Sequence, residues 1–223
     1  NISANTQVHY YKVFHHCLNS AVIDEIITSN PMDKIKNEEK PKRRRTERAF
    51  LTIDELKILS QTDFHNATLK KAFLFSCFCG LRHSDIVALT WGNLKKGKVG
   101  KMELHMTQQK TQEILSLPLS KEALKQLPVR GKVPDTEKVF KGLISLGRTN
   151  EILPKWAAKA GIQKHITFHS ARHTHATMMI TLGADLYTVS KLLGHTNIQT
   201  TQIYAKIVDE SKEKAIDLIP DIT

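Results

Sequence analysis

Hydrophobic residues recur at helical spacing along most of the chain, and strand-like alternation replaces that spacing between residues 101 and 119. Residues 101–107 and 113–119 predict the two strands of a hairpin, with residues 108–112 at its turn. The predicted fold class is therefore mainly α with a small antiparallel β-sheet (α+β). The expected helices are residues 7–28, 53–60, 69–79, 85–91, 120–127, 150–160, 167–182 and 185–193, then one that bears Tyr204 and one at 209–219.

Residues that favour helix ends support these bounds. Thr52 and Glu55 have the spacing of a capping box at the start of one helix. Ser84 and Asn197 are expected N-caps of two others, and Pro154 is expected near the end of the first turn of its helix. Glycines that can end a helix in the left-handed conformation follow three segments, namely Gly80, Gly183 and Gly194.

The first helical segment carries an apolar stripe that we expect to be buried. One or two helices make a poor independent core, so residues 1–38 are predicted to be the C-terminal helices of a truncated helical domain. Residues 39–48 are predicted to be a basic linker, and residues 49–223 the main domain. The stripe consists of Tyr10, Val13, Phe14, Cys17, Leu18, Ala21 and Val22.

Positive charge indicates a polyanionic partner. The whole chain carries 33 Lys and Arg against 22 Asp and Glu, a formal net charge of +11, which favours nucleic acid first and an acidic membrane surface second. Residues 36–48 lose the apolar pattern and hold seven basic and three acidic side chains. They are interpreted as a solvated connector, a nuclear localisation run, or a strap along a phosphate backbone.

Cysteine usage and hydropathy limit the compartment. Cys17, Cys77 and Cys79 form no C-x-x-C pair, which indicates reduced thiols in a cytoplasm-like compartment rather than a disulfide framework or a zinc site. No stretch of about eighteen apolar residues occurs, as a membrane-spanning helix would need. The N-terminus lacks the charged-then-apolar order of a signal peptide.

The segment from 168 to 204 holds the most concentrated chemistry. If His169, Arg172, His195 and Tyr204 face one cavity, they supply two proton carriers, a bidentate oxyanion binder and a nucleophile. A zinc site is disfavoured, because residues 169–173 read H-S-A-R-H, with a cation and without the glutamate of a zinc protease helix.

Two further residues can join this cavity. Arg82 is expected between two helices, where it needs an anion, either a structural carboxylate such as Asp85 or a bound ligand. Lys110 is expected at the hairpin tip, either as an ordinary exposed lysine or reaching into a neighbouring cleft.

Together these residue types suit attack on a phosphodiester without a metal or other cofactor. Two arginines can stabilise the charge that grows on a five-coordinate phosphorus. Because a phenol is only about one part in a thousand ionised at pH 7, Tyr204 needs a base, for which His169 is the candidate. The departing sugar alkoxide needs a proton, which Lys110 can donate.

The motifs that contain these residues resemble those of tyrosine recombinases, the integrase family that shares its chemistry with type IB topoisomerases. The motifs are C-G-L-R-H-S-D-I around Arg82, Q-Q-K-T around Lys110, F-H-S-A-R-H-T around His169 and Arg172, L-L-G-H-T around His195, and Tyr204 nine residues later. They follow the family's order from about residue 50 to 204. The chain departs at Ala171, where the family more often has leucine.

The resemblance implies a role for each residue. It implies that Arg82 and Arg172 clamp the phosphate, Lys110 acts as acid and His169 as acid/base. It also implies that His195 hydrogen-bonds the phosphate and that Tyr204 forms a 3′-phosphotyrosine link. His173 is assigned to structure.

The resemblance also implies an architecture and partners. It implies a mainly helical catalytic domain with a small antiparallel sheet, preceded by the end of a core-binding domain. The expected partners are double-stranded DNA, bound by four protomers on two duplexes, and accessory DNA-bending proteins, with no membrane. The expected function is that of a site-specific recombinase, the integrase of a mobile element. The alternatives are a chromosome-dimer resolvase or invertase, a non-catalytic DNA-binding module, and a metal-dependent nuclease.

Overall fold

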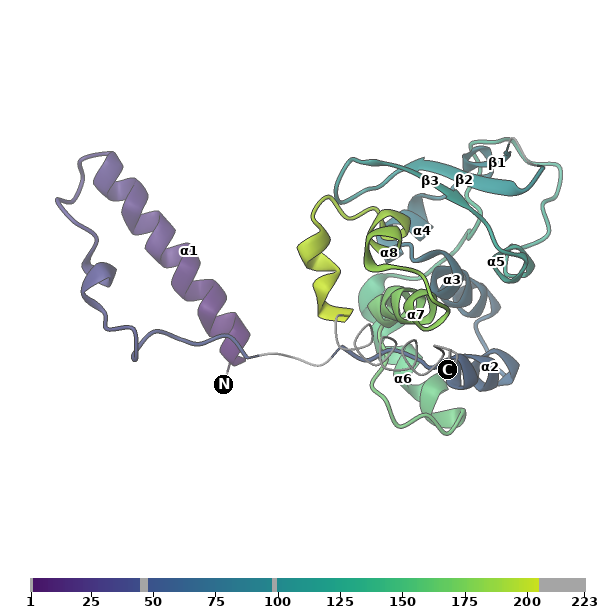
Figure 1. The fold of residues 1–223 in the computed structure, drawn as a ribbon, viewed down its shortest axis with the longest axis horizontal. Helices are drawn as coiled ribbons and strands as arrows, with labels where there is room; N and C mark the ends of the chain where they lie inside the picture. The colour runs from purple at the N-terminus through teal and green to yellow at the C-terminus, as the bar shows by residue number, and fades with distance from the viewer. Residues whose placement is uncertain (1, 45–47, 98–99, 205–223) are drawn as a thin grey trace, which may run out of the picture. The chain divides into compact units, whose positions relative to one another are not determined.

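The computed structural model describes residues 2–44, 48–97 and 100–204, and the chain divides into two compact units, Asn1–Glu47 and Arg48–Thr223 (Figure 1). The first unit contains α1 (Ala4–Ile23) and the 3-10 helix η1 (Pro31–Lys34). Among the described residues, no helix is long and apolar enough to cross a membrane.

Two expectations for the first unit are wrong. The helix ends at Ile23 instead of continuing to residue 28, because Glu25 adopts a left-handed backbone (φ 56°). The apolar stripe is not buried: Tyr10 and Phe14 keep 58% and 59% of their surface, and the residues at its C-terminal end are partly exposed. In the described part of this unit, α1 can pack only against a short 3-10 helix and loops. None of the residues of α1 is therefore buried.

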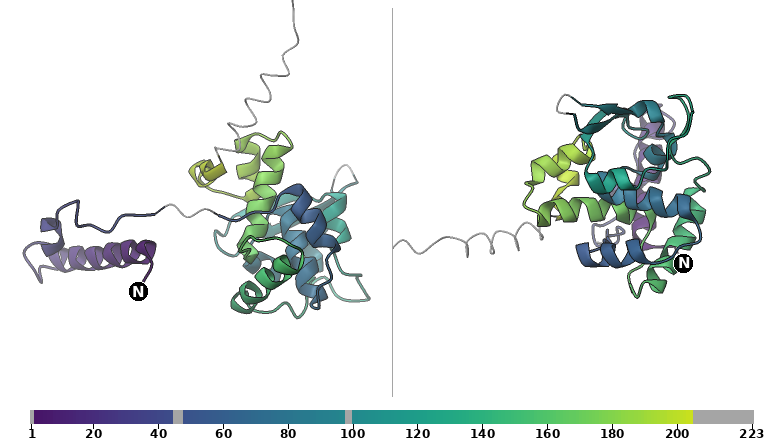
Figure 2. Two further views of the ribbon diagram at one scale, coloured as in Figure 1. Left: turned by 90° about the horizontal axis from the view of Figure 1, so that it is seen from below. Right: turned by 90° about the vertical axis from the view of Figure 1, so that its right-hand side faces the viewer.

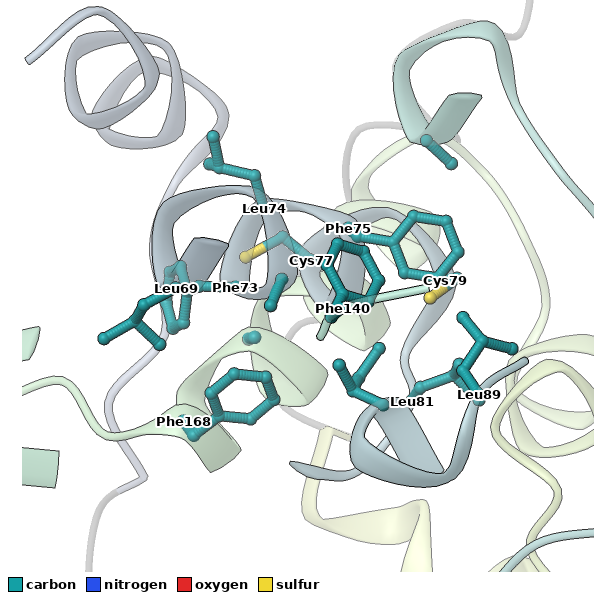
Figure 3. Packing of buried hydrophobic residues seen from close by; sticks show 14 of the residues in the cluster. Leu69, Phe73, Leu74, Phe75, Cys77, Cys79, Leu81, Leu89, Phe140 and Phe168 are labelled. Atoms are coloured by element: carbon teal, nitrogen blue, oxygen red, sulfur yellow. The ribbon is translucent and has the colours of Figure 1, made fainter. Parts of the chain in front are cut away.

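The second unit is built around α3 (Ala67–Cys79), which is buried on nearly all sides. Phe73 of α3 meets Phe168 edge to face, with 5.9 Å between ring centroids (Figure 3). The helix ends as predicted, with Gly80 in the left-handed conformation (φ 71°). The preceding α2 (Ile53–Gln61) begins with the predicted capping box.

A three-stranded antiparallel sheet lies along one edge of the helical body (Figure 1). Its strands are β1 (Leu94–Lys96), β2 (Met102–Thr107) and β3 (Ile114–Pro118), in the order β1-β2-β3. The predicted hairpin is confirmed, with Leu104 opposite Leu117. The pattern missed β1, because three residues with two exposed lysines show no apolar alternation.

Short helices flank the sheet. The 3-10 helix η2 (Trp91–Asn93) precedes it, and α5 (Lys121–Lys125) follows with Ser120 as its N-cap. Before η2, α4 spans His83–Ala88 and not 85–91. The expected Ser84 cap is wrong, because Arg82 is the N-cap and its N–H donates to the Asp85 carboxylate (3.2 Å).

The helix α6 (Leu146–Lys159) begins four residues before the predicted start, with Ser145 as its N-cap. Pro154 therefore lies inside the helix, and not in its first turn. A proline in a helix interior costs about 3 kcal/mol or more. Burial of Leu153 and Trp156 on either side of it offsets this cost, at about 1.5–3 kcal/mol per large apolar side chain.

The C-terminal described part consists of α7 (Phe168–Thr181) and α8 (Leu186–Leu193), then the 3-10 helices η3 (Ile198–Thr200) and η4 (Gln202–Tyr204). α7 lies beside α3 and α8 (Figure 1, Figure 2). Asn197 caps η3, so Tyr204 sits on a second 3-10 turn and not on the helix that Asn197 begins. The helix predicted at 209–219 lies outside the described residues.

Candidate active site

Arg172 is buried at the centre of the site, with 3% of its surface exposed. Its Nη1 donates to the carbonyl of Gly80 (2.8 Å) and its Nη2 to the carbonyl of Leu193 (2.7 Å). These carbonyls lie at the C-terminal ends of α3 and α8, where helix dipoles favour a cation. Burial, and then the charge of Arg82, lower the pKa of Arg172 to about 10, so the guanidinium stays charged at neutral pH.

Arg82 lies at the start of α4 with a free donor. Its Nη1 is buried and has no hydrogen-bond partner among the described residues, although the Oδ2 atom of Asp85 lies 3.9 Å away. Asp85 is fully buried and accepts hydrogen bonds from the backbone N–H groups of Arg82 and Gln109 (2.8 Å to Gln109). Both anions considered for Arg82 are therefore compatible with this site: Asp85 orients it, and one donor is left for a ligand.

Lys110 lies at the exposed turn of the predicted hairpin. The bond from Gln109 to Asp85 fastens this turn to α4, next to Arg82. The charge of Lys110 helps to lower the pKa of His169, so the ammonium lies within electrostatic reach of that imidazole. The turn therefore brings Lys110 to the side of the site that holds Arg82 and His169.

His169 and His195 are neutral bases at neutral pH. Partial burial, and then the charge of Arg172, lower the pKa of each to about 4. Nδ1 of His195 hydrogen-bonds the buried hydroxyl of Thr201 at 2.8 Å, which orients the ring. His169 is exposed. Negative charge on a bound ligand would raise both pKa values.

Tyr204 is buried in a small apolar cluster between α7 and α8. Its hydroxyl lies 2.5 Å from Nδ1 of His173. Burial raises the pKa of Tyr204 to about 12, although the charge of Arg172 acts in the opposite direction. The sequence assigned His173 to structure and did not predict its contact with the phenol. Its position next to Arg172 and one helical turn after His169 was the feature of the sequence that could have placed it in the site.

Arg48 is a second residue that the sequence pattern missed. Its charge lowers the pKa values of His169, His173 and Tyr204. A hydrogen bond from the Leu51 N–H to the Thr174 hydroxyl (2.9 Å) fastens this segment to α7. The last residue of the basic linker therefore adds positive charge to the site.

All six predicted site residues belong to one electrostatic neighbourhood. The charges of Arg82 and Arg172 both lower the pKa of His195. The charge of Lys110 lowers the pKa of His169, and that of Arg172 lowers the pKa of Tyr204. Within the described ranges, no group of three or more His, Cys, Asp or Glu side chains is placed to hold a metal ion. Fixed cations, neutral imidazoles and a buried phenol are what the site offers.

Comparisons with known proteins agree with this chemistry. The phage integrase family model matches residues 49–211. A tyrosine recombinase of Pseudothermotoga lettingae is 30% identical over 199 residues, which cover 87% of this chain and 68% of that protein. The tyrosine recombinase XerC of Caldanaerobacter subterraneus is 30% identical over 207 residues, which cover 88% of this chain and 57% of that protein.

Solved structures share the fold. A lambda integrase dimer bound to a COC′ core site superposes with a TM-score of 0.72 at 19% identity, over 90% of this chain and 73% of that one. The Tn1549 transposon integrase bound to circular intermediate DNA gives a TM-score of 0.69 at 18% identity, over 92% and 75%. Because the family match covers most of the second unit, the chain belongs to the phage integrase family and is a tyrosine recombinase, a DNA breaking-rejoining enzyme.

Proposed function

We propose that this chain is the site-specific recombinase of a mobile element, an integrase that joins DNA through a 3′-phosphotyrosine link on Tyr204. One observation carries the proposal: a buried guanidinium, Arg172, held by two helix ends within electrostatic reach of a buried phenol. The similarity to the Tn1549 transposon integrase supports the mobile-element assignment. The XerC names of several relatives favour a chromosome-dimer resolvase as the second candidate.

The proposed reaction is a transesterification that first cleaves and then rejoins the DNA. The phenol oxygen of Tyr204 attacks the phosphorus, and His169 takes the phenol proton. The bond from phosphorus to the 5′ oxygen breaks, and Lys110 gives that oxygen a proton. Attack by a 5′ hydroxyl of the exchanged strand reverses both steps and rejoins the DNA.

The cations stabilise the transition state. Arg172 keeps N–H donors beyond the two that bind carbonyls, and Arg82 has its unpartnered Nη1, so both can bind non-bridging oxygens. His195 is assigned a hydrogen bond to the same phosphate through Nε2, because Nδ1 is bonded to Thr201. Fixed cations thereby take the part that a divalent ion plays in many nucleases.

The proposed partner is double-stranded DNA, bound by four protomers on two duplexes, with accessory DNA-bending proteins as a further class. The lambda integrase dimer on a core site supports cooperation between protomers. Residues 1–38 are proposed to be the end of a core-binding domain, and 39–48 a strap along the backbone. A plot of log K for DNA binding against log salt concentration falls with a slope of about −0.9 for each phosphate that the protein neutralises. Changing Arg43 and Arg44 to Gln should therefore make this slope shallower by about two.

The test of the nucleophile is covalent trapping on a nicked duplex. Tyr204→Phe should bind the DNA but form no covalent adduct, whereas Tyr187→Phe, an exposed tyrosine on α8, should form it at the parent rate. An adduct with Tyr204→Phe would show that the nucleophile is another residue. If a chelator abolishes adduct formation, a metal-dependent nuclease is favoured instead. If the parent protein binds the DNA but forms no adduct, a non-catalytic DNA-binding module is favoured.

The test of the acid uses a substrate whose leaving group is a 5′ thiol. Lys110→Ala should cleave the normal substrate slowly, by a factor of about 10²–10⁴, and recover on the thiol substrate because a thiolate leaves without a proton. A variant that stays slow on both substrates would assign Lys110 to structure.

Deletion of the gene distinguishes an integrase of a mobile element from a chromosome-dimer resolvase. Loss of the circular form of a resident element, detected by amplification across its joined ends, would support an integrase. Accumulation of unresolved chromosome dimers would support the resolvase.

A further inference from the structure

Gln108 occupies the base of the turn that carries Lys110, and its side chain is fully buried. Its Nε2 donates to the carbonyl of Leu193 at the end of α8 (3.2 Å). Its Oε1 accepts a hydrogen bond from the hydroxyl of Thr111 within the turn (2.9 Å). One amide therefore links the residue after Lys110 to a helix 85 positions away in the sequence.

The end of α8 is shaped to receive this amide. Gly194 has φ +63°, and a Cβ atom there would lie 2.7 Å from Oε1 and 2.8 Å from Nε2 of Gln108. Contacts this short are essentially absent around real Cβ atoms, so a side chain at residue 194 would force the Gln108 amide to move. Glycine at this position therefore suits both the left-handed backbone and the close approach of the Gln108 amide.

The same carbonyl serves the phosphate clamp. Leu193 accepts from both Gln108 Nε2 and Arg172 Nη2. On the other side of the turn, the N–H of Gln109 donates to Asp85, which also accepts from the N–H of Arg82. The turn is thus fastened at residue 108 to the α8 end that binds Arg172, and at residue 109 to the α4 start that bears Arg82.

We propose that Gln108 is a positioning residue for Lys110, and that its amide sets the distance of the Lys110 ammonium from the leaving oxygen by locking the turn to α8. This rests on the proposed role of Lys110 as the acid. Lys110 itself is exposed, so its placement depends on how firmly residues 108, 109 and 111 hold the turn. A misplacement of about 1 Å can slow an enzyme about 10²-fold.

The experiment compares Gln108→Leu with the parent chain on two nicked duplexes, one with a 5′ oxygen and one with a 5′ thiol leaving group. Leucine has a similar size but neither donates nor accepts. Thr111→Val, which keeps the side-chain shape and lies at the partly exposed turn, removes the bond to Oε1 alone. Gln112→Leu is the matched control, because this exposed amide bonds within the turn, to the carbonyl of Gln109, and does not reach α8.

We expect Gln108→Leu to form adduct about 10- to 100-fold more slowly on the oxygen substrate and at near the parent rate on the thiol substrate. Thr111→Val should show the same substrate dependence at about 2- to 10-fold, the effect of one hydrogen bond. Gln112→Leu should stay within about twofold on both substrates. Equal slowing of Gln108→Leu on both substrates would overturn the proposal, since it would place the effect on Arg172 or Tyr204.

Lys110→Ala keeps this proposal separate from the proposed function. If Lys110→Ala recovers on the thiol substrate and Thr111→Val and Gln108→Leu do not, Lys110 is the acid and Gln108 does not position it. If Lys110→Ala does not recover, the assigned acid is wrong, and the proposal falls with it. The double variant Gln108→Leu/Lys110→Ala should be no slower on the oxygen substrate than Lys110→Ala alone, because the two residues act through one group.

Discussion

His173→Phe tests how the resting phenol of Tyr204 is held. Nδ1 of His173 lies 2.5 Å from the phenol oxygen, and both side chains are buried. The His173 ring also meets the His169 ring edge to face, with 4.6 Å between centroids. Phenylalanine preserves a ring in this position but removes the partner of the phenol, so the variant separates packing from hydrogen bonding.

Contact with the phenol gives His173 two alternative roles, a partner that holds the hydroxyl or a base that takes its proton. Burial, and then the proximity of His169 and arginines, lower the pKa of His173 to about 3, while burial raises that of Tyr204 to about 12. The pKa of His169 is lowered to about 4, so the resting pKa values of the two imidazoles are nearly equal and do not separate them as bases. We expect His173 to hold the phenol through the contact of its Nδ1, and His169 to be the base.

Two measurements check this expectation. Guanidinium unfolding followed by circular dichroism should show His173→Phe less stable by about 1–3 kcal/mol, because the buried phenol O–H loses its partner. Single-turnover adduct formation on a nicked duplex should stay within about tenfold of the parent rate, as expected when one hydrogen bond is released. His173→Gln, which keeps an amide acceptor, should regain part of the stability.

His169→Gln is the comparison for catalysis. Loss of a general base slows a reaction by about 10²–10⁴-fold, and we expect that loss for His169→Gln. If His173→Phe unfolds cooperatively like the parent but forms adduct more slowly than His169→Gln, then His173 takes the proton and the assignment of His169 is wrong.

Two further predictions concern stability. Burial lowers the folded-state pKa of His175 to about 4, so its contribution to stability is fully present above its ordinary pKa near 6.5 and is lost as the pH falls through 4. In denaturant titrations at several pH values, His175→Gln should reduce the loss of unfolding free energy between these two pH values by at most about 3 kcal/mol. An unchanged dependence of the unfolding free energy on pH would refute this. Gly194→Ala should destabilise the chain more than Gly161→Ala, because both have positive φ but only at Gly194 does a Cβ meet Gln108, so equal losses would contradict the close contact.

Local sequence signals predicted most of the secondary structure of the second unit. The capping box at Thr52 and the glycine at residue 80 mark helix ends because their hydrogen bonds span three or four neighbouring residues. Prediction failed where tertiary packing overrides local preference. Trp156 and Leu153 keep a helix intact through Pro154, and the Asp85 carboxylate moves the start of α4 to His83.

By itself, the sequence determined which chemical groups are available and their order: two arginines, a lysine, two histidines and a tyrosine in the motifs of one family. Only the tertiary structure decided what those groups contact. Arg172 donates to the carbonyl of Gly80, 92 positions away, and Gln108 to that of Leu193, 85 positions away. Sequence spacing reports neighbours within a helical turn, whereas these bonds exist because packing brings the ends of α3 and α8 to one point.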